Sequence, residues 1–195
     1  MEKKKKLPLY NLMIDDNIEL GVSYVALVDD PAIEINWMAF NNQIQFKADT
    51  ERRIITGALM LSDTPIYRRN ESMGEFNVIF DKHTIEKIVQ RFMKNDFGKQ
   101  VNAMHDPNQL INGVYMYESF ITDKERGIQA PKGFEKVPEG SWFGSYKVEN
   151  EDVWQNFIKT GEFKGFSVEG AFDLVPESKF FAEFNELVNS ITCTK

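Results

Sequence analysis

The sequence predicts an α+β domain built from a Greek-key-like or barrel-like sheet with helices around it. Many short segments alternate apolar and polar residues, as β-strands do, and three segments between and after them repeat with the 3.6-residue period of an amphipathic helix. The chain has 195 residues, of which 42% are hydrophobic and 13% aromatic. This length suits one domain, and the composition provides enough apolar side chains for a core.

Turn signals rich in Asp, Pro, Ser and Gly separate the expected strands. Gly57 indicates a bulge or a close backbone approach inside the second strand. In the last strand Ser167 and Glu169 are two residues apart and therefore share one face. The five Gly and Pro residues between 126 and 140 predict a long loop. The expected strands are 19–29, 53–61, the residues around 76–80, 101–105, 113–121, 141–149 and 166–174.

Three helices are expected. The first begins after Asp81, a suitable N-cap, and ends before Gly98. A second, short helix begins after Asn150, has acidic residues in its first turn and ends at Gly161. The third covers 177–191 and carries its apolar residues on one stripe. That stripe consists of Phe180, Phe181, Phe184, Leu187, Val188 and Ile191.

These elements divide the chain into three parts. Residues 1–18, which include the lysines at positions 3–6, are expected to form an N-terminal tail, because blocks of like charge stay solvated. Residues 19–176 form the domain, and 177–195 form a C-terminal amphipathic helix. The apolar stripe of that helix either packs on its own domain or is the interface of a homodimer.

Charge and cysteine content exclude several classes of protein. With 23 Lys and Arg against 30 Asp and Glu, the net charge is −7, which disfavours nucleic acid and favours peptides or proteins as partners. One cysteine, Cys193, cannot form an intramolecular disulfide, and with two histidines it does not make a recognisable zinc site. We find no signal peptide, no run of roughly 18 apolar residues and no Gly-rich phosphate loop. The sequence thus predicts no metal, no cofactor, no membrane contact and no secretion.

Two residues are candidates for chemistry. His105 follows an apolar strand, where it could face a cleft, although its position alone favours a structural, hydrogen-bonded histidine. Ser167 follows Gly165-Phe166, but its surroundings are not the G-x-S-x-G nucleophile elbow of an α/β-hydrolase. His83 is expected on an exposed helix turn, and Cys193 is too close to the chain end to hold a fixed geometry.

Two stretches resemble the signature segments of phage prohead maturation proteases, and three more resemble the XkdF-type serine proteases of PBSX-like prophages. The first two are Met104-His105-Asp106-Pro107 with Gly113-Val114, and Lys164-Gly165-Phe166-Ser167-Val168-Glu169-Gly170-Ala171-Phe172; the other three are Val28 to Glu34, Tyr117 to Ile121 and Val137 to Trp142. This resemblance implies the fold of herpesvirus assemblins, a closed β-barrel surrounded by helices, and a serine endopeptidase activity.

Carried onto this chain, the resemblance implies that Ser167 is the nucleophile and His105 its general base. Assemblins complete the triad with a second histidine after the serine, but no histidine follows Ser167 here. A carboxylate would have to hold the His105 ring instead. Glu118 is the first choice, on the strand after His105, and Asp106 and Glu169 are the alternatives. Asp106 would more naturally cap its own turn, whereas Glu169 lies within about 7 Å of Ser167 by strand rise.

The resemblance also implies the substrates and the cellular location, and one departure from it leaves a second function open. The substrates would be the capsid scaffold and the major capsid protein, cleaved inside the procapsid in the cytoplasm of the infected bacterial host. Backbone amides near 165–167 or in the loop 126–140 would stabilise the oxyanion. The helix at 177–195 would lie where relatives continue into a scaffold-like extension. The absent second histidine leaves open a non-enzymatic, protease-like module for capsid assembly.

Overall fold

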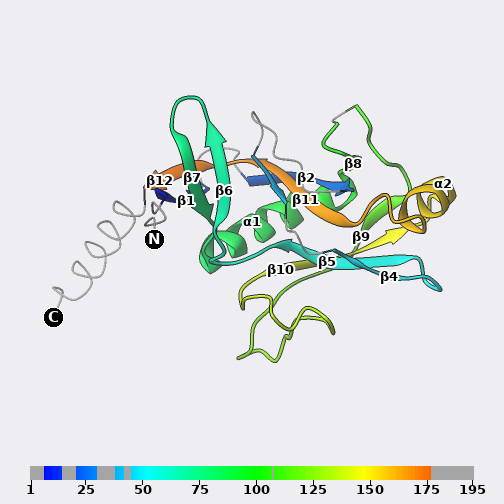
Figure 1. Ribbon diagram of the computed structural model, residues 1–195. Helices are drawn as coiled ribbons and strands as arrows, with labels where there is room; N and C mark the ends of the chain where they lie inside the picture. The colour runs from blue at the N-terminus through cyan, green and yellow to red at the C-terminus, as the bar shows by residue number, and fades with distance from the viewer. Residues whose placement is uncertain (1–6, 15–20, 30–37, 42–44, 107, 177–195) are drawn as a thin grey trace, which may run out of the picture.

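The computed structural model describes residues 7–14, 21–29, 38–41, 45–106 and 108–176. In this part of the chain the fold is mostly β, with two α-helices (Figure 1). The helices are α1 (Lys82–Lys94) and α2 (Glu151–Val153). The strands are β1 (Leu9–Met13), β2 (Gly21–Val28), β3 (Met38–Asn41), β4 (Lys47–Asp49), β5 (Ile54–Met60), β6 (Ile66–Asn70), β7 (Gly74–Ile79), β8 (Val101–Ala103), β9 (Val114–Ile121), β10 (Trp142–Val148), β11 (Gly165–Ala171) and β12 (Asp173–Pro176).

The described strands form three open, four-stranded sheets. Their orders are β12-β1-β7-β6, β4-β5-β10-β9 and β3-β11-β2-β8. The predicted closed barrel is therefore not found among these strands. The neighbouring strands β8 and β9 belong to different sheets, because β8 pairs in parallel with β2 while β9 pairs with β10. Alternation predicts that a strand exists, but not which strand it pairs with.

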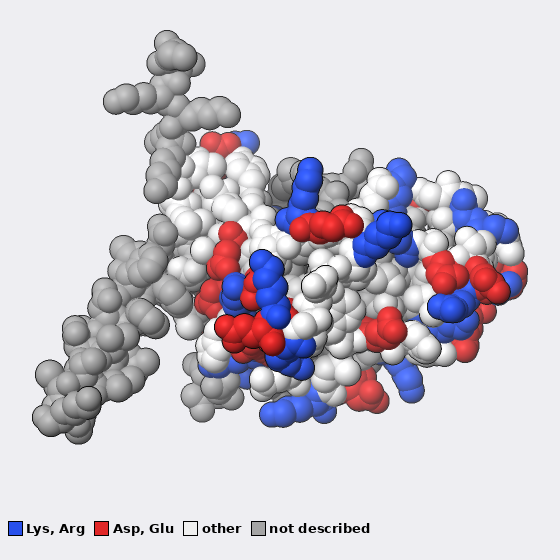
Figure 2. All heavy atoms as spheres, turned by 90° about the horizontal axis from the view of Figure 1, so that it is seen from below, with Lys and Arg blue, Asp and Glu red and all other residues white. Residues whose placement is uncertain are grey.

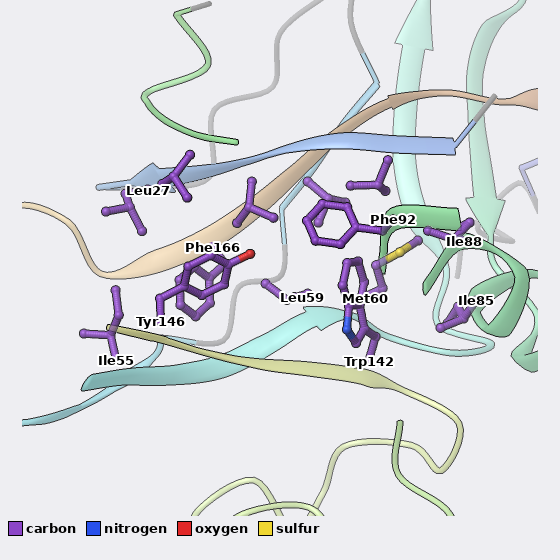
Figure 3. Packing of buried hydrophobic residues seen from close by; sticks show 14 of the residues in the cluster. Leu27, Ile55, Leu59, Met60, Ile85, Ile88, Phe92, Trp142, Tyr146 and Phe166 are labelled. Atoms are coloured by element: carbon purple, nitrogen blue, oxygen red, sulfur yellow. The ribbon is translucent and has the colours of Figure 1, made fainter. Parts of the chain in front are cut away.

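The core lies between the sheet of β2 and β11 and the sheet of β5 and β10 (Figures 1 and 3). Phe166 on β11 packs on Tyr146 on β10, with ring centroids 5.1 Å apart. Gly57 on β5 lies at a close backbone approach, one of the two features that the sequence predicts there, because a Cβ would lie 3.2 Å from the Phe46 Cα and 3.2 Å from the Phe166 ring. The Phe166 and Tyr146 side chains are fully buried. Two well-packed layers thus hold β11 rigidly from its core-facing side.

Helix α1 closes one end of this core. The Asp81 side chain accepts a hydrogen bond from the Thr84 amide at 2.7 Å, which confirms the predicted N-cap. Phe92 is fully buried and packs edge-on against Trp142, with ring centroids 5.1 Å apart (Figure 3). The Trp142 indole in turn donates to the Ser119 hydroxyl at 2.9 Å. One aromatic contact thereby ties the helix to the sheet.

The second predicted helix is shorter than expected. The Asn150 side chain caps it by accepting from the Val153 amide at 3.1 Å. After one α-helical turn the chain continues as a π-helical turn, Trp154–Ile158, and Gly161 follows with φ of 74°. Residues 126–140 contain no strand or helix, as predicted.

The predicted N-terminal tail is wrong at its inner boundary. Leu9–Met13 form β1, which pairs with β12 and β7, and Leu12 is fully buried. The sequence did not indicate this strand, because it has only five residues and its polar Asn11 is also buried. The lysines at 3–6, the turn after Asp29, the helix at 177–191 and Cys193 lie outside the described residues.

Lysine and arginine side chains are intermixed with aspartate and glutamate on the face seen in Figure 2. Ion pairs in the described part of the chain include Arg53 with Glu151 and Lys124 with Glu139. Such alternation of sign gives no broad positive field on this face of the kind that attracts nucleic acid. Among the described residues, no helix combines the length and apolar character that crossing a membrane requires.

Replacement of Phe92 by alanine should destabilise the domain by about 3–5 kcal/mol, because the variant loses a buried ring and leaves a cavity beside Trp142. The free energy of unfolding from urea denaturation measures this loss. Met93→Ala is the matched control, since the neighbouring Met93 is 52% exposed and should change stability little. Equal losses in the two variants would show that the contact between α1 and β10 does not hold the core.

Candidate active site

Strand β11 presents its side chains to two different environments. Phe166 and Val168 belong to the hydrophobic core between the sheets. Ser167 and Glu169 alternate with them and therefore point to the opposite face, as the sequence predicts. Both are nevertheless buried, Ser167 fully and Glu169 with 8% of its surface exposed. The strand thus carries two polar side chains into a region with little solvent.

Gly170 lets β11 and β2 approach closely beside Glu169. A Cβ at this position would lie 2.1 Å from the Gly21 carbonyl oxygen, so no other residue fits without backbone movement. The register between β11 and β2 shifts between Glu169 and Gly170. Such an irregularity turns the neighbouring side chain relative to a regular strand. Gly170 therefore helps to set the direction of the Glu169 side chain.

A row of residues crosses the sheet at the level of Ser167. Ala26 on β2 is in register with Ser167 on β11 and with Asn102 on β8. Residues in register point to the same face of a sheet. Ala26 is fully buried and carries only a methyl group, so the longer side chains on either side can approach each other across it. Strand β2 is therefore the spacer between the two halves of the site.

His105 follows β8 in an uncommon backbone conformation. The predicted strand 101–105 ends at Ala103, because Met104 and His105 have φ of 52° and 64°, in the left-handed region. Non-glycine residues there cost of order 1–3 kcal/mol each and occur mainly where surrounding contacts impose them. One such contact is the Met104 amide, which donates to the Leu27 carbonyl at 3.0 Å. The strained turn redirects the His105 side chain back over the sheet.

The structure places a carboxylate behind His105, and it is that of Glu169. The His105 Nδ1 atom lies 3.0 Å from Glu169 Oε1, and the two side chains are 13% and 10% exposed. This distance is that of an ion pair when the ring is protonated, although the geometry is not that of a regular hydrogen bond. Hydrogen bonds at catalytic residues are often poorly aligned without substrate.

Glu169 also contacts Asn102. The Asn102 side-chain amide donates to Glu169 Oε1 at 2.8 Å, and Asn102 is fully buried. Burial by itself raises the pKa of the Glu169 carboxyl, but the contacts with His105 and Asn102 outweigh it and hold the pKa below its usual range. Glu169 is thus ionised at neutral pH. The sequence analysis did not single out Asn102, whose only signal is a polar side chain in an apolar strand.

The Ser167 hydroxyl is buried without a hydrogen bond to any described residue. Buried hydroxyls are nearly always hydrogen-bonded, so an unpaired one is unusual. In this conformation the serine is neither bonded to His105 nor open to solvent.

The other predicted residues lie elsewhere. Glu118 was expected to face His105 across a sheet, and this placement is wrong, because Glu118 is exposed on β9 beside Ser145 of β10. Asp106 caps its own turn, accepting from the Asn108 amide at 2.9 Å and the Gln109 side chain at 2.7 Å. The Asn108 amide is the main cause that lowers the pKa of Asp106. His83 is exposed on α1, as expected.

The loop 126–140 does not lie beside Ser167. Its Phe134 packs edge-on against Phe143 of β10, with ring centroids 5.4 Å apart, and contributes to a small cluster with Ala58. This cluster is on the side of β10 away from β11, where the loop lies in Figure 1. Within the described residues, no three side chains of His, Cys, Asp or Glu are grouped so that they could hold a metal ion.

Comparison with known proteins identifies the family. The family model described as "Putative phage serine protease XkdF" matches residues 41–175, which include His105, Ser167 and Glu169. The chain belongs to this family. A search of the curated proteins and a search of the solved structures each found no match. The XkdF match begins after β2, although β2 is the strand that joins the two halves of the site.

Replacement of Ala26 by leucine should destabilise the domain by about 1–3 kcal/mol, since added methyl groups in a packed site force neighbouring side chains aside. The same variant should also separate Asn102 from Glu169. Thermal unfolding and an NMR spectrum of the Asn102 side-chain amide measure the two effects. Ala48→Leu, at an exposed position on β4, is the control. An unchanged amide resonance in Ala26→Leu would show that Ala26 is not the required spacer.

Glu169 should make stability depend on pH. Its pKa in the folded chain is below the ordinary 4.5, so its contribution is complete above about pH 4.5 and is lost as the pH falls through the lower folded value. The free energy of unfolding of Glu169→Gln should therefore fall less steeply below pH 4.5 than that of the unmodified chain. Urea denaturation between pH 7 and pH 3 measures both slopes. The exposed Glu162→Gln should keep the original slope; identical slopes in all three proteins would contradict the assignment.

Proposed function

We propose that this chain is a serine endopeptidase in which Ser167 is the nucleophile, His105 the general base and Glu169 the carboxylate that orients the histidine. The observation that carries the proposal is the contact of 3.0 Å between His105 Nδ1 and Glu169 Oε1, on the face of the sheet that also carries Ser167. A carboxylate in this position selects the tautomer with hydrogen on Nδ1 and leaves Nε2 free to accept a proton.

The proposed reaction is acyl transfer without a cofactor. Ser167 Oγ attacks the carbonyl carbon of the scissile peptide bond while His105 Nε2 takes the hydroxyl proton, and the charge on Glu169 stabilises the imidazolium. The imidazolium then donates this proton to the departing amine, which leaves an ester on Ser167. Water, deprotonated by the same histidine, hydrolyses the ester and returns the serine. Every proton taken by His105 is given back within one cycle.

The proposed cycle requires a change of conformation. The Ser167 hydroxyl is buried and makes no hydrogen bond with the described residues, so both substrate entry and the contact with His105 need local movement. Many enzymes open and close their sites in this way. The resting state described here would then be a closed form of the protease.

The substrates that we propose are the capsid scaffold and the major capsid protein, cleaved inside the procapsid. Membership of a family of phage serine proteases supports this proposal. Among the described strands, β3 lies at an edge of the sheet, directly beside β11. A peptide in extended conformation could add to such an edge by main-chain hydrogen bonds.

A second candidate function is a non-enzymatic module of capsid assembly that keeps the protease fold. The burial of the Ser167 hydroxyl and its missing hydrogen bond favour this alternative. The two functions differ in one respect, because only a protease needs Ser167 to react.

Ser167→Ala should abolish cleavage of a scaffold protein that is co-expressed with the full chain, because no other group forms the acyl intermediate. A fluorophosphonate probe should label the unmodified chain at Ser167, and His105→Ala should lower the labelling rate by at least about 100-fold, a usual contribution of a general base. Gel analysis and peptide mass spectrometry measure both effects.

Ser72→Ala serves as the matched control, since Ser72 is exposed in the turn between β6 and β7 and should leave both cleavage and labelling unchanged. Circular dichroism of each variant separates loss of activity from loss of fold. Unchanged processing by Ser167→Ala would remove Ser167 from the mechanism. Absence of labelling during active assembly would favour the assembly module.

A further inference from the structure

Asn102 is a buried polar residue between Val101 and Ala103 in the short strand β8. It lies on β8 with no exposed surface, and its Oδ1 atom has no hydrogen-bond partner among the described residues. Leaving a buried acceptor unpaired opposes folding, and valine or isoleucine would suit a buried strand better. The fold alone therefore does not explain asparagine here. The Asn102 side chain does donate a hydrogen bond of 2.8 Å to Glu169.

The chemistry of Glu169 fixes the orientation of the Asn102 amide. An ionised carboxylate only accepts hydrogen bonds, so the NH₂ group of Asn102 must face it and Oδ1 must point away. This explains why Oδ1 is the atom left without a partner. Hydrogen bonds from neutral donors to a charged group are stronger than those between neutral groups. The unpaired oxygen is thus the consequence of holding the carboxylate.

Asn102 and His105 approach the same atom of Glu169. The Asn102 Nδ2 atom lies 2.8 Å from Oε1, and the His105 Nδ1 atom lies 3.0 Å from that oxygen. Both residues belong to one short segment, which hydrogen bonds from Ala103 to Gln109 and from Met104 to Leu27 hold in place. The hydrogen bond from Asn102 therefore holds the Glu169 carboxylate beside His105, three residues further along the same segment.

Within the described residues, the ionisable group in contact with this carboxylate is His105 after β8. Tyr24 is the register partner of Glu169 on β2. Asn102 is neutral, so it stabilises the charge on Glu169 without competing with His105 for it. A second cation in its place would weaken the influence of Glu169 on the imidazolium.

We propose that Asn102 is a positioning residue, which holds the Glu169 carboxylate charged and directed at His105. This inference rests on the proposed protease function for its effect on catalysis, but not for its effect on Glu169. It predicts that the asparagine acts through its amide hydrogen rather than through its size. Aspartate has the same shape and lacks that hydrogen, so Asn102→Asp is the sharpest variant.

The first test measures Glu169 directly by an NMR titration of its side-chain carboxyl in the full chain. In Asn102→Asp two carboxylates would share one site, which should raise the pKa of Glu169 by roughly one pH unit or more. Asn102→Ala should raise it by less, because only the donor is lost. Asn108→Asp is the matched control, since Asn108 lies in the neighbouring turn and bonds Asp106 rather than Glu169. A pKa of Glu169 that is the same in all four proteins would overturn the proposal.

The second test measures the rate of probe labelling at Ser167 between pH 5 and pH 9. In Asn102→Asp the acidic limb of this profile should move to higher pH, with about tenfold slower labelling on that limb for each pH unit of displacement. A purely structural role would lower the rate equally at every pH. If labelling of Ser167 never occurs in the unmodified chain, the protease proposal fails and the titration still decides the role of Asn102. If Asn102→Asp does not fold, Asn102→Ala and Asn102→Ser take its place in both tests.

Discussion

The pairing of β2 with two partners is the constraint on which the candidate site depends. Strand β2 bonds β8 in parallel on one side and β11 antiparallel on the other. The histidine comes from the end of β8 and the serine from β11, more than 60 positions apart in the sequence. The register of β2, with Ala26 in the middle, places Ser167 level with Asn102, three residues before His105. A family match that begins at residue 41 leaves out the strand that assembles the site.

Local patterns predicted much of the fold, because the interactions behind them are local. The caps Asp81 and Asn150 bond amides three residues away, so the sequence alone carries them. The alternation along β11 likewise placed Ser167 and Glu169 on one face. The predicted barrel and the tail at 1–18 failed, because both depend on which distant strand a segment meets. The five residues of β1 become a strand only through β7 and β12.

The choice among carboxylates could not be made from sequence for the same reason. Glu118, Asp106 and Glu169 were distinguished by their distance along the chain from His105 or Ser167. The decisive facts are that β8 and β9 enter different sheets and that Met104 and His105 adopt left-handed backbone conformations. Neither follows from hydrophobic periodicity. Asn102 was missed because one polar residue in a three-residue strand has no pattern around it.

In the proposed mechanism, the burial of Ser167 Oγ makes the reactivity of Ser167 depend on a conformational equilibrium. When opening and closing are fast, the observed reaction rate equals the intrinsic rate multiplied by the open fraction, as in the hydrogen exchange of a buried amide. The apparent affinity for a substrate is lowered by that same fraction. Each 1.4 kcal/mol that favours opening would thus give about tenfold faster reaction without any change at His105 or Glu169. Under the proposed mechanism, surroundings that bias this equilibrium could therefore change the reaction rate without contacting Ser167, His105 or Glu169.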